Sequence, residues 1–275
     1  MENALVSIIV PCYNQGEYLS EALNSLIAQS YPYWECVIMD DGSTDNSKSV
    51  ALSFCEKDKR FSYFWQENQG LSMTRNNGIK RSHGEYILPL DADDKIHPDY
   101  LGLAVEILDH QKDIAIVYSR AELFGARSGE WYLPDFNMDD FMKENCIFCS
   151  AMYRRKDYNR TVGYNPNMKG GWEDWDFWLS LMENGGNVYK LPYKLFYYRI
   201  KNASMAISLN KSQEIIDSLH KTIVMNHPLM FFRHYSSLHD RYYAHRIVFH
   251  KKMYYRLNCR IGVYLDKILK FFRRG

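Results

Sequence analysis

The sequence lacks the features of a membrane-spanning, secreted or low-complexity protein. Across its 275 residues, no apolar run approaches the roughly 20 residues that a membrane-spanning helix needs. The opening MENALVSIIVPCYN has an acid where a signal peptide carries a basic region, and its apolar stretch is short. Glycine, at 15 residues, and proline, at 8, are too sparse for collagen-like or low-complexity structure. We therefore expect a folded, cytoplasmic chain.

Cysteine is present but forms no framework. The six cysteines are scattered, and only Cys146 and Cys149 form a CxxC pair, with no second pair to complete a zinc site. Without an export signal, we expect buried, reduced thiols. The sequence also lacks the GxGxxG and P-loop lysine motifs. A phosphate ligand would therefore need a metal and arginine to hold it.

The net charge is also small, at +1, but it hides an asymmetry. Residues 241–275 carry ten Lys and Arg against one acid, which gives +9, and the rest of the chain carries 24 against 32, which gives −8. With 46% hydrophobic and 24% charged residues, the composition is that of a globular protein. At about 150 residues per domain, the length fits one large domain with an extension. We expect an acidic body with a basic tail.

Short apolar runs alternate with helical patterns in the first half of the chain. We expect strands at residues 6–13, 34–41, 60–66, 85–91 and 114–119, with helices over 18–27, 43–57, 71–82 and 98–110. This alternation indicates βαβ units, hence an α/β fold with a mostly parallel sheet flanked by helices. The second half is less regular: we expect a hairpin over 119–134, a strand in 145–155, a helix within 168–186 and an extended segment over 187–200.

Polar side chains follow three of the expected strands, namely Tyr13-Asn14, Asp40-Asp41 and Asp91–Asp94. In open α/β sheets, ligands bind beyond the carboxyl ends of the strands. Burying carboxylates there without a partner is costly, so three such ends favour a ligand or cation. A helix cap is the alternative for Asp40-Asp41. Asp91 and Asp93 offer the hard oxygen ligands that Mg²⁺ or Mn²⁺ prefers.

Three segments, in order, resemble the motifs of the inverting family-2 glycosyltransferases with the GT-A fold. They are VSIIVPCYN to MDDGSTDNS (6–47), QENQGLSMTRNN to LPLDADD (66–94) and GGWEDWDFWLSLMENGG (170–186). The resemblance covers roughly residues 5–205. It implies a GT-A domain over 1–205, with a nucleotide-binding half of about 1–95 and an acceptor half of about 96–205, and a basic helical extension over 206–275.

The resemblance assigns the donor site to the first two segments. The residues near the nucleotide would be Pro11, Tyr13, Asn14, Glu17, Asn68, Gly70 and Arg75. Asp40 matches the carboxylate that accepts a hydrogen bond from uracil. In Asp91-Ala92-Asp93, the first carboxylate would lie towards the ribose and the second on Mn²⁺ or Mg²⁺, with Asp91 as a further metal ligand.

The third segment would serve the acceptor. Asp174 matches the family's catalytic base and follows Glu173, while Gly171 lets the backbone approach a sugar closely and Trp172 offers it an aromatic face. The alternative is that these two acids only complement a helix dipole. We expect at least one of Trp175 and Trp178 in the core, because they share a helix face.

Two departures from the family pattern bear on the mechanism. Where members often carry a histidine after the last sheet segment, this chain has Lys201. A charged lysine cannot ligate a metal, but it can neutralise a departing diphosphate. The Q-x-x-R-W signature of processive synthases is absent, which favours transfer of one sugar per encounter.

The resemblance implies transfer of a hexose or N-acetylhexosamine from a UDP-sugar to a hydroxyl of a glycan or lipid-linked saccharide, in polysaccharide biosynthesis at the cell envelope. Three alternatives stay open: a nucleotide-sugar-binding partner subunit without activity, a nucleotidyltransferase, and a membrane-surface adaptor. Intact Asp93 and Asp174 argue against the first. The absence of Lys and Arg from PCYNQGEYL argues against the second.

The basic tail has its own pattern. Apolar residues recur at helical spacing from Leu257 to Phe272, and most basic residues lie elsewhere on the helical wheel. A basic amphipathic helix over 241–275 favours an anionic membrane surface, here the inner face of the cell membrane. The alternative is a helix docked on its own domain. We do not expect nucleic acid as a partner, because the body is acidic.

Overall fold

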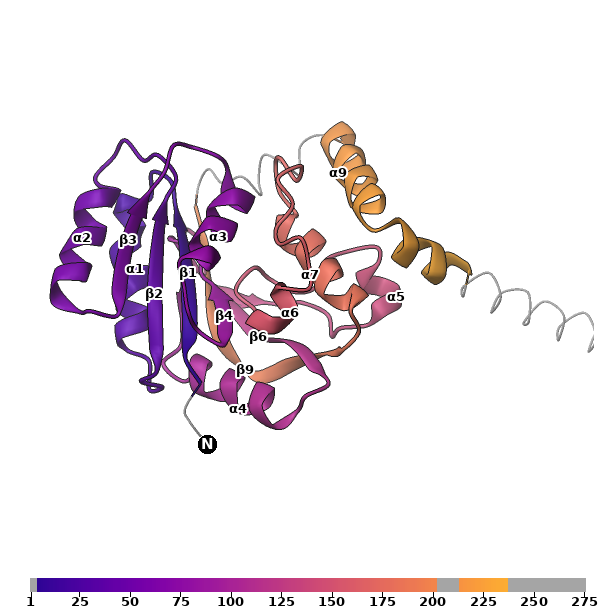
Figure 1. Cartoon of the computed structure of the whole chain (residues 1–275), viewed down its shortest axis with the longest axis horizontal. Helices are drawn as coiled ribbons and strands as arrows, with labels where there is room; N and C mark the ends of the chain where they lie inside the picture. Colours follow the sequence, from indigo (N-terminus) through magenta and orange to yellow (C-terminus); the bar gives the residue numbers. More distant parts are fainter. Residues whose placement is uncertain (1–3, 202–212, 237–275) are drawn as a thin grey trace, which may run out of the picture. The chain divides into compact units, whose positions relative to one another are not determined.

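The computed structural model describes residues 4–201 and 213–236, which contain one nine-stranded sheet flanked by helices (Figure 1). The strand order is β3-β2-β1-β4-β8-β6-β9-β5, and β7 pairs with β6 off this path. The strands are β1 (Val6–Cys12), β2 (Trp34–Asp40), β3 (Phe61–Trp65), β4 (Tyr86–Pro89), β5 (Lys95–Ile96), β6 (Ile114–Gly125), β7 (Gly129–Trp131), β8 (Met152–Arg154) and β9 (Asn187–Ile200). The helices are α1 (Gly16–Ile27), α2 (Ser47–Lys57), α3 (Leu71–Lys80), α4 (Tyr100–His110), α5 (Met138–Phe141), α6 (Arg155–Tyr158), α7 (Glu173–Glu183) and α9 (Gln213–Asn226). The expected α/β fold is confirmed.

The first four strands form the parallel part of the sheet. β1 pairs in parallel with β2 and β4, and β2 pairs in parallel with β3. Every residue of β1 is buried, as expected where helices cover both faces of a parallel sheet. The strands predicted at 6–13, 34–41 and 60–66 are confirmed to within one residue at each end. Parallel pairing brings the carboxyl ends of β1, β2 and β4 to one edge.

The second part of the sheet contains both parallel and antiparallel pairs. The parallel pairing that the sequence predicts is therefore found mainly among the first four strands. β8 is antiparallel to β4 and β6, β5 is antiparallel to β9, and β7 forms the expected hairpin with β6, whereas β6 and β9 are parallel. β5, β7 and β8 are only two or three residues long. The strand expected in 145–155 is confined to β8. β5 was not expected, because a strand of two residues shows no periodic pattern in the sequence.

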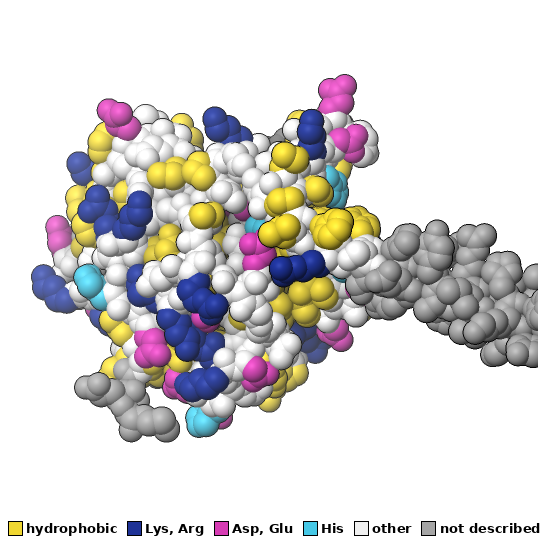
Figure 2. Space-filling model, turned by 45° about the vertical axis from the view of Figure 1, so that its right-hand side comes forward, with side chains coloured by type: hydrophobic (Ala, Val, Ile, Leu, Met, Phe, Trp, Pro, Cys, Tyr) yellow, Lys and Arg dark blue, Asp and Glu magenta, His cyan; other side chains and the backbone are white. Residues whose placement is uncertain are grey.

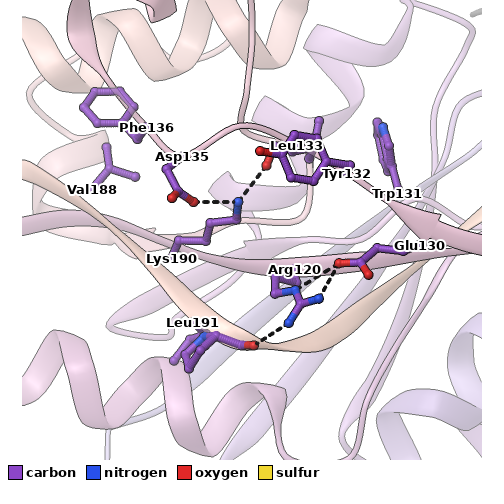
Figure 3. A pocket seen from close by; sticks show the side chains of 11 residues that line it. Arg120, Glu130, Trp131, Tyr132, Leu133, Asp135, Phe136, Val188, Lys190 and Leu191 are labelled. Carbon is purple, nitrogen blue, oxygen red and sulfur yellow. Dashed lines mark hydrogen bonds and ion pairs between the residues drawn. The ribbon is translucent and has the colours of Figure 1, made fainter.

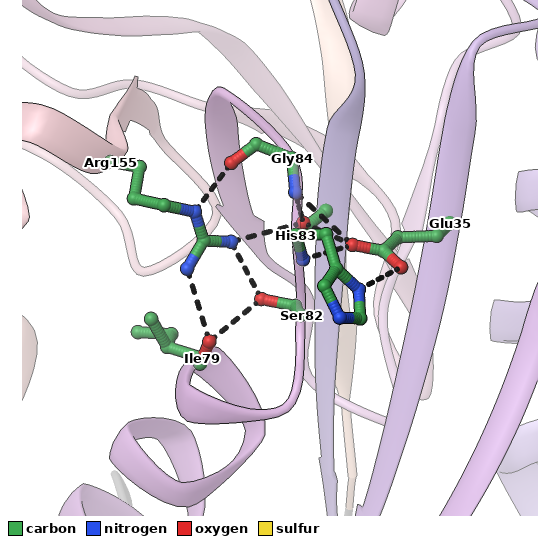
Figure 4. A network of polar contacts seen from close by, with 7 residues as sticks. Glu35, Ile79, Ser82, His83, Gly84 and Arg155 are labelled. Atoms are coloured by element: carbon green, nitrogen blue, oxygen red, sulfur yellow. Dashed lines mark hydrogen bonds and ion pairs between the residues drawn. The ribbon is translucent and has the colours of Figure 1, made fainter.

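A polar network at the amino-terminal edge joins the two parts of the sheet (Figure 4). The Arg155 guanidinium, at the start of α6, donates to the carbonyl oxygens of Gly84 and Ile79 and to the hydroxyls of Ser82 and Ser7. The Ser7 hydroxyl in turn donates to Glu35 on β2. The network fixes α6 and β8 from the edge opposite the strands' carboxyl ends, which stay available for a ligand.

Residues up to His227 form one compact unit, and residues from Pro228 onward belong to a second. α9 lies in the first unit. The domain limits expected near residues 95 and 205 stay predictions. Residue 205 and the basic helix expected over 241–275 lie outside the described residues. Among the helices that the structure describes, none is long and apolar enough to cross a membrane.

Candidate active site

The loops after β1 and β2 are joined at the carboxyl edge of the sheet. The Asn14 backbone N–H donates to the Ser43 hydroxyl (2.9 Å), and the Asn14 side-chain oxygen accepts from the Thr44 N–H (2.8 Å). Asn14 has a φ of 52°, a left-handed conformation that asparagine tolerates better than most residues. Tyr13 exposes 51% of its surface, so its ring is open to a ligand. Of the other residues expected here, Pro11 is buried in β1 and Glu17 is exposed in the first turn of α1.

Two buried carboxylates at the end of β2 shape the loop that follows β3. Asp40 accepts from a backbone N–H in the next turn and from the Tyr63 hydroxyl (2.7 Å). Asp41, for which no individual role was expected, accepts from the Gly70 N–H (2.9 Å). It thereby sets the course of the loop that carries Asn68 and Gly70, which are both exposed. Neither carboxylate caps α2, which begins later in the chain.

One buried guanidinium brings two distant motifs together. Arg75 on α3 is 1% exposed and donates to Asp91 Oδ1 and Glu173 Oε1, each at 2.7 Å. Glu173 lies 98 residues further along the chain. A buried charge needs paired partners, so this contact ties the end of β4 to the start of α7. The sequence placed Arg75 along the nucleotide, whereas the structure places its charge between two carboxylates.

An acidic cluster follows β4. Asp91, Asp94 and Cys149 bring ligand atoms within 4.8 Å of one another. Asp94 is 2% exposed, and its Oδ2 has no hydrogen-bond partner among the described residues. Burial and the charges of Asp93 and Asp91 raise the pKa of Asp94. A buried carboxylate oxygen without a partner fits a bound cation, so this donor set is compatible with a divalent metal.

Lys201 supplies a positive charge beside this cluster. Its ammonium lies 2.5 Å from Asp93 Oδ2 and 2.8 Å from Gln15 Oε1, and it stands 4.5 Å from the centre of the Tyr18 ring. These contacts join the end of β9 to the start of α1 across the carboxyl edge. Asp93, the expected metal ligand, is thus directed to Lys201, and Ala92 beside it is buried.

The chain enters α7 through an unusual turn. Gly170, Gly171 and Trp172 all have positive φ, at 110°, 128° and 61°. Glycine adopts this conformation without strain, whereas the side chain of Trp172 makes it unfavourable there. Trp172 is half-buried, and its ring packs 5.4 Å from Trp175 and 4.7 Å from His220 of α9. Trp175 and Trp178 are both buried, which confirms that this helix face is core.

Asp174 stands at the start of α7 with an unusual acidity. Burial and the neighbouring Glu173 carboxylate raise the pKa of Asp174 to about 7, while Arg75 acts in the opposite direction. The side chain is half-buried, and one oxygen accepts from the Trp175 N–H (2.7 Å). Glu173 is engaged by Arg75, so it does more than complement the helix dipole. A carboxylate with this pKa can accept a proton near neutral pH.

A cavity of about 580 Å³ lies along β7, the loop after it and β9 (Figure 3). Two ion pairs and several aromatic rings line it, including Arg120 with Glu130, Lys190 with Asp135, and Trp131. The Trp131 ring stands 4.7 Å from the Tyr198 ring. Burial and the nearby Asp94 raise the pKa of the Tyr198 hydroxyl.

Four residues of the site received no individual role in the sequence analysis. Asp41 and Asp94 stand next to predicted carboxylates, but nothing in the sequence distinguishes them from helix caps. Cys149 donates its thiol to Asp91 (3.4 Å) and was expected only as a buried thiol. Arg199 donates its backbone N–H to Asp94 (2.8 Å). Because any residue type can donate a backbone N–H, no side-chain pattern in the sequence could have predicted this contact.

Sequence comparison places these motifs among known enzymes. The sequence model of glycosyl transferase family 2 matches residues 7–167. TuaG of Bacillus subtilis (strain 168), a glycosyltransferase named for teichuronic acid biosynthesis, is 31% identical over 214 residues, which cover 75% of this chain and 82% of TuaG. The glycosyltransferase GlyA of Streptococcus pneumoniae serotype 4 is 43% identical over 112 residues, which cover 40% of this chain and 16% of GlyA.

Solved structures show the same fold. TarS (1–349) of S. aureus in complex with UDP-GlcNAc matches with a TM-score of 0.69 at 22% identity, over 80% of this chain and 66% of that chain. A mannosyltransferase from Pyrobaculum calidifontis, in complex with GDP-Man and Mn²⁺, matches with a TM-score of 0.58 at 17% identity, over 86% and 74%. The chain spans less than two thirds of GlyA and of this TarS chain.

Proposed function

Because the chain belongs to glycosyl transferase family 2, we propose that it moves a hexose or N-acetylhexosamine from a UDP-sugar to a hydroxyl of a glycan or lipid-linked saccharide, with inversion at the anomeric carbon. The observation that carries this proposal is the Arg75 bridge, which sets the carboxylates after β4 beside Glu173 and Asp174. The fold of TarS, which binds UDP-GlcNAc, and the likeness to TuaG support a UDP-sugar donor and a glycan acceptor.

The nucleotide would lie over the carboxyl ends of β1 and β2. The open ring of Tyr13 supports stacking on the uracil base, and the family resemblance gives Asp40 the role of accepting a hydrogen bond from it. Asp41 holds the loop of Asn68 and Gly70 against the same edge. Asn14 fixes the neighbouring turn.

Asp174 would act as the general base. It takes the proton from an acceptor hydroxyl while that oxygen forms a bond to the anomeric carbon, and the bond from this carbon to the diphosphate breaks on the opposite face. UDP leaves with the bonding electrons, and an α-linked donor gives a β-linked product. The pKa of about 7 supports this role, because the carboxylate is ionised in a large share of molecules at neutral pH.

The leaving diphosphate needs positive charge. Lys201, beside Asp93, would supply it from the chain itself, and the buried Arg75 would add positive potential through its pairing with Asp91. Mn²⁺ or Mg²⁺ would be held by Asp91 and Asp93, as the sequence predicts, with Asp94 added because its Oδ2 lacks a partner. When bound, such an ion offsets negative charge on the departing diphosphate.

The acceptor would approach along the second half of the chain. The cavity beside Trp131 offers aromatic rings for the apolar faces of sugars. Its paired charges offer both donors and acceptors to hydroxyl groups. Trp172, packed on α9, lines the other approach near Asp174.

The first test is Asp174→Asn. The variant keeps the shape of the side chain but cannot accept the acceptor's proton. We expect UDP release during transfer to fall by about 100- to 10,000-fold, with UDP binding by calorimetry changed by no more than a few-fold. Asp99→Asn, which alters a carboxylate 57% exposed on a surface loop, should leave both measurements unchanged.

Three results would contradict this proposal. Full transfer by Asp174→Asn would remove the general base. Release of pyrophosphate in place of UDP would identify a nucleotidyltransferase. Donor binding without turnover on any glycan acceptor would identify a partner subunit without activity. NMR of the product's anomeric proton decides between inversion and retention.

A further inference from the structure

The acidic cluster after β4 contains a sulfur atom as well as carboxylate oxygens. Cys149 lies just before β8, and its Sγ stands 3.4 Å from Asp91 Oδ2. Asp91, Asp94 and Cys149 each bring one ligand atom within 4.8 Å of the others. Ligand atoms about 2.0 to 2.3 Å from one shared ion lie roughly 3 to 4.5 Å from one another. Small side-chain movements therefore suffice to close this set around a single ion.

Both carboxylates are held through one oxygen and keep the other for a ligand. Arg75 donates to Asp91 Oδ1 (2.7 Å), and the thiol contacts Oδ2. The Arg199 backbone N–H donates to Asp94 Oδ1 (2.8 Å), whereas Asp94 Oδ2 has no hydrogen-bond partner among the residues that the structure describes. Asp94 is only 2% exposed, so bulk water does not solvate this oxygen. A buried carboxylate oxygen needs a partner, and a bound cation would supply one.

Positive side chains do not supply that partner. Arg75 is shared between Asp91 and Glu173, and Lys201 pairs with Asp93. In the part of the chain that the structure describes, no ion pair includes Asp94. Burying an unpaired carboxylate is costly, and a divalent cation bound beside Asp94 would remove that cost.

The sulfur atom indicates which divalent cation fits this set. Mg²⁺ takes oxygen ligands almost exclusively, whereas a thiolate is a soft ligand that binds transition-metal ions more strongly. Zn²⁺ and Co²⁺ accept carboxylate oxygen and thiolate sulfur together. A set of two carboxylates and one thiol therefore favours these ions over Mg²⁺.

We propose that the sulfur of Cys149 binds the divalent ion together with Asp91 and Asp94, and that the site consequently prefers a transition-metal ion to Mg²⁺. The thiol proton passes to solvent when the metal–sulfur bond forms. The role of the ion rests on the reaction proposed above. Its binding does not, because it can be measured without donor or acceptor.

A titration of the chelator-treated full chain with Co²⁺, without added thiols, tests the sulfur ligand. A cobalt–thiolate bond gives a charge-transfer absorption band in the near ultraviolet, which oxygen ligands do not give. We expect the band to saturate near equal concentrations of ion and chain. It should be absent from Cys149→Ser, which keeps the size of the side chain and replaces sulfur with oxygen.

The matched control is Cys55→Ser, because Cys55 on α2 is the other half-buried cysteine among the described residues. This variant should keep the band. Surface carboxylates should add only weak binding, since Asp and Glu side chains are scattered over the face shown in Figure 2.

Calorimetry with Zn²⁺ and Mg²⁺ tests the preference. The unaltered chain should bind Zn²⁺ at least roughly 100-fold more tightly than Mg²⁺. Cys149→Ser should lose about tenfold or more in Zn²⁺ affinity and change in Mg²⁺ affinity by no more than a few-fold. Retained Mg²⁺ binding also shows that the variant is folded. Asp94→Asn, which removes a charged ligand and keeps its shape, should weaken the binding of both ions.

Several outcomes would overturn the proposal. A cobalt band that persists in Cys149→Ser, or disappears in Cys55→Ser, would place the sulfur ligand elsewhere. Equal losses of Zn²⁺ and Mg²⁺ affinity in Cys149→Ser would reduce the thiol to a structural role. Metal binding that Asp94→Asn leaves unchanged would remove this carboxylate from the site. An intact band in a chain that releases no UDP with any acceptor would contradict the proposed reaction and leave the metal site standing.

Discussion

Asp174 has the acidity of a base that works near neutral pH. Burial and Glu173 raise its pKa to about 7, against the opposing effect of Arg75. Below this pH the carboxyl becomes protonated and can no longer accept the acceptor's proton. The transfer rate should therefore decline on the acidic side of pH 7.

Glu173→Gln tests this account. Removing the Glu173 charge lowers the pKa of Asp174, and it also releases the Arg75 guanidinium from one of its two carboxylates. The acidic limb of the kcat/KM profile, followed by UDP release, should move to lower pH by roughly half to one unit. Glu144→Gln, at an exposed surface position, serves as the matched control. A limb that stays in place, or moves to higher pH, would contradict the proposed electrostatic cause.

At the scale of elements, α9 is held to the helix that carries Asp174. His227, at the end of α9, is 2% exposed and lies 3.2 Å from Asp176 Oδ1 and 2.9 Å from Glu183 Oε1, both on α7. The Asn226 amide donates to Asp176 (2.6 Å), and so does Asn165 (2.6 Å). Burial alone would lower the pKa of His227, but the two carboxylates outweigh it and raise the pKa.

This contact should make stability depend on pH. Because the pKa of His227 is higher in the folded state, its stabilisation is complete below the ordinary value of about 6.5 and is lost as pH rises through the raised value. His227→Gln should lower the Tm by roughly 5 °C at pH 6, and the deficit should shrink as pH rises. His110→Gln removes an exposed histidine and is the control. A deficit that grows with pH in thermal melts would refute the ion-paired histidine.

At the scale of the whole first unit, two arginines join the two parts of the sheet from opposite edges. Arg75 links β4 to α7 at the carboxyl edge, and Arg155 links α6 to β1 and to the residues before β4 at the amino edge. Only the first link lies at the edge of the sheet where the substrate is proposed to bind. We therefore expect the Arg75 contacts to serve the proposed reaction and the Arg155 contacts to serve the stability of the fold.

Arg155→Ala should therefore affect stability more than ligand binding. The change removes one donor from each of four oxygen acceptors, so we expect the free energy of unfolding to fall by about 2 to 4 kcal/mol in urea denaturation. UDP affinity, measured where the variant is folded, should change little. The exposed Arg127→Ala is the control. Lost UDP affinity with unchanged stability would reverse this assignment of roles.

Much of the fold and part of the site could be predicted from the sequence. The strands β1, β2 and β3 appeared because fully buried strands are continuous apolar runs, and Asp91, Asp93 and Asp174 appeared because they belong to ordered motifs. The parallel register of β1 with β2 then brings Asn14 and Asp40 to one edge. The two-residue strand β5 left no such signal.

The sequence by itself determined the α/β alternation, the family, and which carboxylates follow the strands, since each of these is written in local patterns. Tertiary structure alone decided that the Arg75 charge lies between Asp91 and Glu173, that Lys201 faces Asp93, and that Cys149 and Asp94 complete the acidic cluster. The physical reason is that a buried charge pairs with whichever group lies near it in the folded chain. Residues that are far apart in the sequence can form such a pair, and their spacing along the sequence does not reveal it.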